Sequence, residues 1–150
     1  KALSLLGSAA IANSRLVWEA FLESRRTASW SEMQDMGAHK QRPLWASTGV
    51  KDPRFDDTRY VMDLAVPDSV NTVPEATLQA VHDHGKFIGD AVTENISEAH
   101  LVWESLESLG ISRQSVCAKL ESDGVRQFIE AWERLRETVA SAAQTATVGH

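Results

Sequence analysis

The sequence of 150 residues has a single cysteine and no long apolar run. Because Cys117 has no partner for an internal disulfide, we expect a reducing compartment, the cytoplasm. Its place in an apolar pattern predicts that Cys117 lies in the core or at the core boundary. No apolar run approaches the roughly 20 residues that a membrane-spanning helix needs, so no membrane partner is expected.

Basic residues are also scarce relative to acidic ones. The 15 lysines and arginines stand against 21 aspartates and glutamates, which gives a formal net charge of -6. Nonspecific nucleic-acid binding needs basic surface to neutralise phosphates, so a nucleic-acid partner is not expected, while a small local anion site stays compatible with this charge. A hydrophobic content of 43% is that of a folded globular protein. Internal repeats and composition shifts are absent too, so residues 1–150 are interpreted as a single segment.

The chain begins with KALSLLGSAAIA, small and apolar residues after one lysine. A signal peptide has a similar composition, but this pattern continues with helical period through Trp18 and contains no convincing cleavage site. We therefore interpret the stretch as the start of a helix. No methionine stands at position 1, which is compatible with a start inside a longer chain.

The first 37 residues predict two helices. Apolar residues at three- and four-residue steps predict a long helix over residues 2–24. A polar, methionine-containing stretch then predicts a short second helix that ends at Gly37. The expected buried stripe of the first helix consists of Leu6, Ala9, Ala10, Asn13, Val17, Ala20 and Phe21.

Residues 43–48 and 69–73 are the strand candidates, and residues 57–65 predict a short helix between them. The first strand is apolar without alternation, as expected of a strand buried on both faces in a parallel sheet. Strands that alternate with helices indicate such a sheet. Two strands cannot form a stable parallel sheet alone, so the chain is interpreted as part of something larger.

The remaining residues predict helices only. Thr72 and Glu75 have the spacing of a capping box at the start of the first of them. Gly85, Gly110 and Gly124 are expected to end the next three helices. The expected buried residues are Leu78 and Val81 in the first, Ile96, Ala99, Trp103, Leu106 and Leu109 in the second, Val116 and Leu120 in the third, and Val125, Phe128, Ile129, Trp132, Leu135 and Val139 in a last helix.

Two motifs carry a family resemblance: RPLWASTGVKDPRFDDTRYV at residues 42–61 and DSVNTVPEATLQAVHDHG at residues 68–85. Together they resemble the transaldolase family, in particular the type found in actinobacteria. The stretches AAIANSRLVWEAF, LVWESLESLGIS and GVRQFIEAWERL are similar to later helices of the same family, in the same order. The resemblance therefore covers nearly the whole chain.

This resemblance implies an α/β fold, the C-terminal part of a (β/α)8 TIM barrel followed by C-terminal helices. Residues 43–48 and 69–73 then resemble barrel strands seven and eight, and the first helix follows strand six. The family transfers a dihydroxyacetone unit between sugar phosphates through a lysine Schiff base. It links sedoheptulose 7-phosphate and glyceraldehyde 3-phosphate to erythrose 4-phosphate and fructose 6-phosphate in the pentose phosphate pathway, and no cofactor is implied.

The chain lacks most of the strands and the catalytic motifs of the family. A barrel of this class takes roughly 250 residues and eight strands, whereas only two strand candidates are present here. The family's motifs for the Schiff-base lysine and for the acid/base aspartate and glutamate do not occur in the sequence. We therefore assign no catalytic residue in this chain, expect the segment alone to be inactive, and expect the N-terminal part of the same enzyme as its partner.

Lys51 and Ser47 are the candidate residues for binding a substrate phosphate. Lys51 follows a strand at its carboxyl end, where barrel active sites are built, and Gly49 permits close approach of a ligand to the backbone. Alternatively, Lys51 is a solvent-facing loop residue and Ser47 satisfies the end of the strand. For Thr48 the structural role is favoured. A Schiff base at Lys51 is not expected.

The spacing of the histidines and carboxylates does not indicate a metal site. His82 and His84 stand at i and i+2, which places them on different helix faces, and the helix C-terminus accounts for both. The acidic cluster of Asp52, Asp56 and Asp57 is interpreted as turn and cap chemistry, since a carboxylate-rich loop repels phosphorylated substrates.

A rival interpretation is a noncatalytic helical binding or scaffold module derived from the same fold. The apolar faces of its two strands favour either self-association into a homo-oligomer or a complementing N-terminal partner. Sequence that encodes five or six further βα units upstream distinguishes the enzyme from this module.

Overall fold

The computed structural model describes residues 3–148, and the side chains of residues 3–144. The chain divides after Leu109 into two compact units. The first unit contains two strands and most of the helices, and the second unit is a single long helix. In the part of the chain that the structure describes, no helix combines the length and the apolar character needed to cross a membrane.

The first long helix, α1, spans Ser8–Ser24, and a short 3-10 turn at Leu3–Leu5 precedes it. The predicted start at residue 2 lies outside the described residues, and the helix itself begins later than expected. Gly7 causes the delay, because it adopts a left-handed φ of 76°. A Cβ atom there would stand 2.6 Å from Nη1 of Arg59 and 2.7 Å from Cζ of Phe55, so a side chain at this position would also require both neighbouring side chains to move.

The buried face of α1 differs from the predicted stripe. Leu6, Ala10, Val17 and Ala20 are exposed, and the other three predicted positions are only half-buried. The helix has apolar residues around most of its circumference, so periodicity alone does not select one face. The neighbouring elements select the positions that α1 buries, which are Ile11, Ala12, Leu16 and Trp18.

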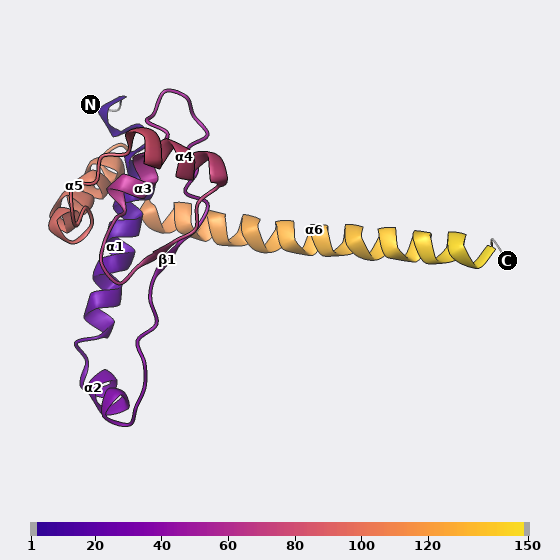
Figure 1. Cartoon of the computed structure of the whole chain (residues 1–150), viewed down its shortest axis with the longest axis horizontal. Helices are drawn as coiled ribbons and strands as arrows, with labels where there is room; N and C mark the ends of the chain where they lie inside the picture. The colour runs from indigo at the N-terminus through magenta and orange to yellow at the C-terminus, as the bar shows by residue number, and fades with distance from the viewer. Residues whose placement is uncertain (1–2, 149–150) are drawn as a thin grey trace. The chain divides into compact units, whose positions relative to one another are not determined.

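The short helix α2 spans Ala28–Asp35 and confirms the second predicted helix. Thr27 caps it, since its side chain accepts a hydrogen bond from the backbone nitrogen of Trp30. Gly37 follows with a φ of 94°, as expected of a glycine that ends a helix. Figure 1 shows α2 beyond the C-terminal end of α1, with a long return segment that leads back to β1.

The sheet consists of the parallel strands β1 (Leu44–Trp45) and β2 (Val70–Asn71), with Leu44 opposite Val70 and Trp45 opposite Asn71. The parallel pairing is the predicted one, but both strands are shorter than expected. The prediction that the first strand is buried on both faces is wrong, because Leu44 is 53% exposed while Trp45 is buried. Only one face of β1 is covered within the described residues. The predicted helix between the strands is α3, Arg59–Asp63.

Helix α4 spans Glu75–His84 and ends at Gly85, as predicted. The expected capping box does not form. Pro74 occupies the N-cap position with an extended backbone, and no side chain caps this end. The predicted inner face is also wrong for Leu78, which is exposed, because α4 buries Thr77 instead.

Helix α5 spans Ile96–Glu107, directly after a 3-10 turn at Thr93–Asn95. Its predicted stripe is largely confirmed. Ala99, Trp103 and Leu106 are buried, and they form one hydrophobic cluster with Ala12 and Leu16 of α1. Two side-chain pairs also join α1 to α5, with Nη1 of Arg15 2.8 Å from Oε2 of Glu98 and Nε2 of His100 2.8 Å from Oε2 of Glu19.

A second hydrophobic cluster joins α1 to the sheet. It contains Ile11, Trp18, Trp45, Leu64 and Val92. The indole nitrogen of Trp18 also donates a hydrogen bond to Oγ1 of Thr93, at 3.0 Å. Helix α1 therefore contributes residues to both hydrophobic clusters of the first unit. Through the second cluster it packs on β1 and on the segment that follows α4.

The second unit contains helix α6, which runs without interruption over Arg113–Val148. The prediction that Gly124 ends a helix is wrong. Gly124 does not have a positive φ, and the ion pair of Asp123 with Arg126 spans it at 3.3 Å. One glycine inside a helix costs only about 1 kcal/mol, which neighbouring good helix formers offset.

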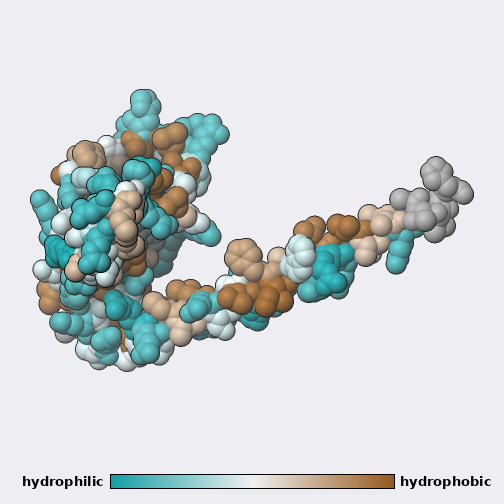
Figure 2. All heavy atoms as spheres, turned by 90° about the horizontal axis from the view of Figure 1, so that it is seen from below, coloured by the Kyte–Doolittle hydropathy of each residue, from teal (hydrophilic) through white to brown (hydrophobic). Residues whose placement is uncertain are grey.

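Among the described residues of its own unit, no other helix or strand packs on α6, and its apolar residues are exposed. Figure 2 shows them as hydrophobic patches along the helix. Trp132 is 59% exposed, which contradicts its prediction as a packing residue. Cys117 is likewise exposed, so the prediction of a core or boundary position is wrong in this structure. The other predicted core positions found exposed on α6 are Val116, Leu120, Val125, Phe128, Ile129, Leu135 and Val139.

Candidate functional site

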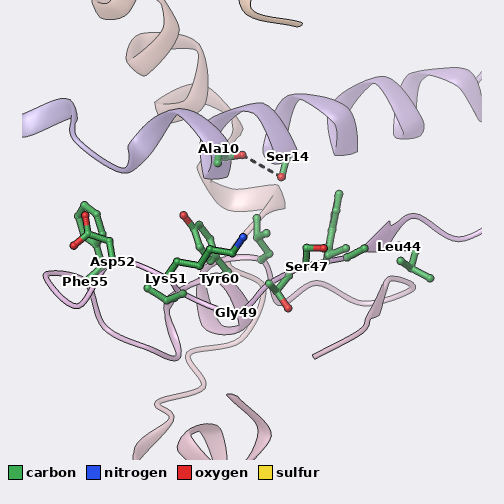
Figure 3. A pocket seen from close by; sticks show the side chains of 14 residues that line it. Ala10, Ser14, Leu44, Ser47, Gly49, Lys51, Asp52, Phe55 and Tyr60 are labelled. Carbon is green, nitrogen blue, oxygen red and sulfur yellow. Dashed lines mark hydrogen bonds between the residues drawn. The ribbon is translucent and has the colours of Figure 1, made fainter. Parts of the chain in front are cut away.

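A cavity of about 500 Å³ lies where the chain leaves β1. The loop after β1 forms one side of it, and Ala10 and Ser14 of α1 form another. Tyr60 of α3 also lines the space. Figure 3 shows these residues below α1, with Ser14 donating a hydrogen bond to the carbonyl oxygen of Ala10 at 3.1 Å. The cavity therefore stands at the carboxyl end of a parallel strand.

Lys51 and Ser47 both line this cavity. Lys51 is exposed and forms no ion pair with the other described residues. In Figure 3 its amino nitrogen points into the space between the loop and α1. A lysine in this position offers a solvated ammonium to an anion that enters the cavity.

The carboxylate next to Lys51 is already paired. Asp52 accepts hydrogen bonds from the side chain of Arg54, with Nη2 at 2.6 Å, and from its backbone nitrogen at 3.0 Å. These hydrogen bonds, with the side chain of Arg54 as the larger cause, lower the pKa of Asp52 to about 2. Asp52 therefore remains ionised, and Arg54 balances its charge next to Lys51 in the chain.

Ser47 has an unusual backbone conformation. Its φ is 58°, in the left-handed region that residues other than glycine rarely adopt. The side chain is exposed, so burial does not impose this conformation. Strained residues of this kind cluster at ligand sites, so the backbone of Ser47 marks the carboxyl end of β1 as a candidate ligand site.

Thr48 has a structural role. Its side chain is 4% exposed, and Oγ1 donates a hydrogen bond to Oδ1 of Asn71 at 2.8 Å. The bond ties the end of β1 to β2. This confirms the interpretation that favoured a structural role for Thr48.

Replacing Thr48 with valine should destabilise the chain by about 1–3 kcal/mol, because Oδ1 of Asn71 loses its donor in a partly buried place. Thr48→Ser keeps the hydroxyl and is the matched control, expected to lose only about 0.8 kcal/mol for one methyl group. Urea denaturation of the three proteins measures the difference. A valine variant as stable as the serine variant would show that the hydroxyl does not matter.

Gly49 brings the loop close to the start of α4. A Cβ atom on Gly49 would stand 3.2 Å from Cγ of Pro74, which is tighter than usual, and 3.5 Å from Oγ1 of Thr77, which is an ordinary contact. The close approach therefore serves packing between the loop and α4. It fixes the backbone between Ser47 and Lys51.

Asp52 and Asp56 act as turn groups, as predicted, whereas Asp57 does not. Oδ1 of Asp56 accepts a hydrogen bond from the backbone nitrogen of Thr58 at 2.8 Å. The hydroxyl and the backbone nitrogen of Thr58 lower the pKa of Asp56, the hydroxyl being the larger cause. Asp57 faces His84 instead, with 2.7 Å between Oδ1 and Nε2.

His84 and His100, two of the described histidines, lie in different places in the first unit. His84 lies between Asp57 and Asp83, and hydrogen bonds with these carboxylates, the one with Asp57 being the larger cause, raise the pKa of His84. His100 pairs with Glu19 on another part of the unit. Among the described residues, the group that could hold a metal ion is Asp56, Asp57 and His84, and all three are exposed. Their hydrogen bonds account for their positions, and the absence of a metal site stays a prediction.

Several cavity residues were not predicted from the sequence as site residues, among them Ser14, Phe55 and Tyr60. Ser14 lies more than thirty positions before the loop, and nothing in the periodicity of α1 marks it. Tyr60 lies in the predicted helix of residues 57–65, nine positions after Lys51, so the sequence does contain a signal that places it near the loop. Only the folded arrangement brings these residues together.

A family model described as "Transaldolase/Fructose-6-phosphate aldolase" matches residues 3–139. The chain is 46% identical over 140 residues to "Transaldolase" of Thermobifida fusca, which covers 93% of this chain and 38% of the relative. It is 50% identical over 129 residues to "Transaldolase 2" of Streptomyces coelicolor, with 86% and 35% covered. With "Transaldolase 1" of Streptomyces avermitilis it shares 48% identity over 141 residues, with 94% and 37% covered. The chain thus spans little more than a third of the length of these relatives.

Proposed function

The chain belongs to the transaldolase/fructose-6-phosphate aldolase family, and on that premise we propose that the whole protein is a transaldolase. The proposed reaction moves a dihydroxyacetone unit between sugar phosphates, from sedoheptulose 7-phosphate to glyceraldehyde 3-phosphate, in the pentose phosphate pathway. The observation that carries the proposal is high identity to transaldolases over most of the chain. The single cysteine, which has no internal disulfide partner, supports a cytoplasmic location.

In this proposal β1 and β2 are barrel strands seven and eight, and α1 follows strand six. Their parallel pairing and the helical connection through α3 support the assignment. Helix α6 belongs to the C-terminal helical region. Other parts of the same enzyme supply the remaining strands and cover the exposed face of Leu44.

Lys51 and Ser47 are proposed to hold the phosphate group of the substrate. Both line one cavity at the carboxyl end of β1, the face of a barrel where active sites are built. The ammonium of Lys51 offsets phosphate charge, and the hydroxyl of Ser47 can donate a hydrogen bond. Holding the phosphate fixes the position of the carbonyl carbon at the other end of the sugar, which is where the chemistry occurs.

The covalent step is proposed to use a lysine outside these 150 residues. Its unprotonated amine attacks the ketone carbon of the substrate, and loss of water gives an imine. The protonated imine accepts the electron pair, as an enamine, when the bond between the carbon next to it and the following carbon breaks. The hydroxyl on that following carbon gives its proton to a base, and the aldehyde product leaves. The role of the residues described here is therefore to bind and orient the substrate.

Borohydride trapping tests this assignment. In the full-length protein, fructose 6-phosphate and sodium borohydride should give a stable secondary amine on a lysine outside the 150 residues, located by peptide mass spectrometry. The 150-residue chain alone should give no adduct. An adduct on Lys51, or on any other lysine of this chain, would overturn the division of roles, and a full-length protein without an adduct would overturn the proposed reaction.

A second candidate is the noncatalytic binding or scaffold module of the same ancestry. The exposed apolar residues of α6 favour it, because they would suit a partner protein as well as a barrel. The trapping experiment separates the two candidates, since such a module gives no adduct in any form of the protein.

A further inference from the structure

A second cavity, of about 440 Å³, lies at the opposite end of β1 from Lys51. It is lined by the C-terminal half of α1, by Trp30 of α2 and by residues 40–44, which lead into the strand. Figure 1 shows this region of the first unit where α1, α2 and the return segment meet. Val17, Pro43 and Leu44 provide apolar walls and Phe21 and Trp30 aromatic ones. The rest of the lining is the neutral polar pair Ser24 and Gln41 and three positively charged residues.

Three cationic side chains line this cavity: Arg25, Lys40 and Arg42. Lys40 donates a hydrogen bond to the carboxylate of Asp68, which precedes β2. That hydrogen bond is the main cause of the lowered pKa of Asp68, and the charges of Arg25 and Arg42 contribute, which places both arginines near the same carboxylate. Three cations thus face one anion, and this local excess occurs in a chain with a net charge of -6.

The two arginines keep their charge available. Within the described residues, neither Arg25 nor Arg42 forms an ion pair with a carboxylate. Aromatic rings hold the guanidinium group of Arg25, which lies 5.2 Å from the ring centroid of Phe21 and 5.6 Å from that of Trp30. A guanidinium held in this way loses little further entropy when it binds an anion.

We propose that this cavity binds a phosphate group, either as inorganic phosphate or as the monoester of a small ligand. A phosphate carries close to two negative charges at neutral pH, which matches the excess of positive charge, and arginines bind it through paired hydrogen bonds. The apolar and aromatic walls can take the organic part of a monoester. The site is separate from Lys51 and Ser47, and the inference does not depend on the proposed function.

Nuclear magnetic resonance of the full-length protein tests the site through Trp30. Its indole N–H signal is assigned by its loss in Trp30→Phe, and it is followed during titration with inorganic phosphate and with glycerol 3-phosphate at pH 7.5. A saturable shift is expected. Tighter binding of glycerol 3-phosphate identifies a monoester site, and equal binding identifies a site for free phosphate.

Charge-removing variants decide whether the arginines bind the ligand. Arg25→Gln and Arg42→Gln should each raise the Kd by at least about tenfold, the loss expected when a charged hydrogen bond is removed. Arg26→Gln is the matched control, because Arg26 is exposed beside Arg25 but does not line the cavity; its Kd should change by less than about twofold. A Trp30 signal that neither phosphate moves would overturn the proposal, as would equal losses in all three variants or unchanged binding in Arg42→Gln.

Discussion

Replacing Leu106 with alanine is expected to lower the free energy of unfolding of the 150-residue chain by about 2–5 kcal/mol. Leu106 is 8% exposed and packs in the cluster that joins α5 to Ala12 and Leu16 of α1. The loss combines the transfer of apolar atoms to water with the cavity that the smaller side chain leaves. Because α1 also packs on β1, loosening this contact should weaken the whole first unit.

Leu101→Ala is the matched control for this prediction. Leu101 lies on the same helix, but it is 61% exposed, so the same substitution should change stability by no more than about 0.5 kcal/mol. Both variants gain the same helix propensity, and the difference between them isolates burial. Urea denaturation followed by tryptophan fluorescence measures it. Equal losses in the two variants would mean that α5 packs through a different face.

Helix α5 also shows when periodicity predicts a buried face correctly. Its apolar residues occupy one stripe, and it packs mainly on one neighbour, α1, so pattern and packing agree at Ala99, Trp103 and Leu106. Helix α1 has apolar residues on several sides and packs on both hydrophobic clusters. Which of its residues are buried depends on where those neighbours stand, and no local pattern contains that information.

Three of the four helix ends predicted at glycines are found in the structure, and Gly85 ends its helix with a φ of -59°, without the left-handed backbone. Gly37 and Gly110 have φ values of 94° and 85° and follow the ends of helices, as expected. Gly124 was predicted by the same rule, yet it lies inside α6. A glycine permits a left-handed residue but does not impose one, and the sequence around Gly124 favours continuing the helix.

The candidate site was predicted in part. The position of Lys51 after a strand placed it at the carboxyl end of β1, and the structure finds it with Ser47 in one cavity. The positive φ of Ser47 could not be predicted, since serine rarely adopts it. Ser14 enters the site through tertiary packing of α1, which a motif within residues 42–61 cannot reveal, whereas Tyr60 belongs to that motif.

Replacing Lys51 with methionine in the full-length protein is expected to raise the KM for fructose 6-phosphate by about tenfold or more, with a smaller effect on kcat. Methionine keeps most of the length of the side chain but removes the ammonium, and a hydrogen bond to a charged group contributes about 1.5–3 kcal/mol. Phosphate binding is the same in the ground state and the transition state, so its loss appears mainly in KM. Steady-state kinetics with fructose 6-phosphate as donor measure both constants.

Two controls make this result specific for Lys51 and for phosphate. Lys86→Met removes an exposed lysine outside the cavity and should leave KM within about twofold of the original value. With glyceraldehyde, an acceptor that lacks the phosphate, the Lys51→Met and unmodified enzymes should show similar KM values for the acceptor, because no phosphate is present to lose a partner. An unchanged KM for fructose 6-phosphate would remove Lys51 from the site. A loss that is equally large with glyceraldehyde would mean that Lys51 supports the loop, since binding a phosphate cannot account for an effect on a substrate without one.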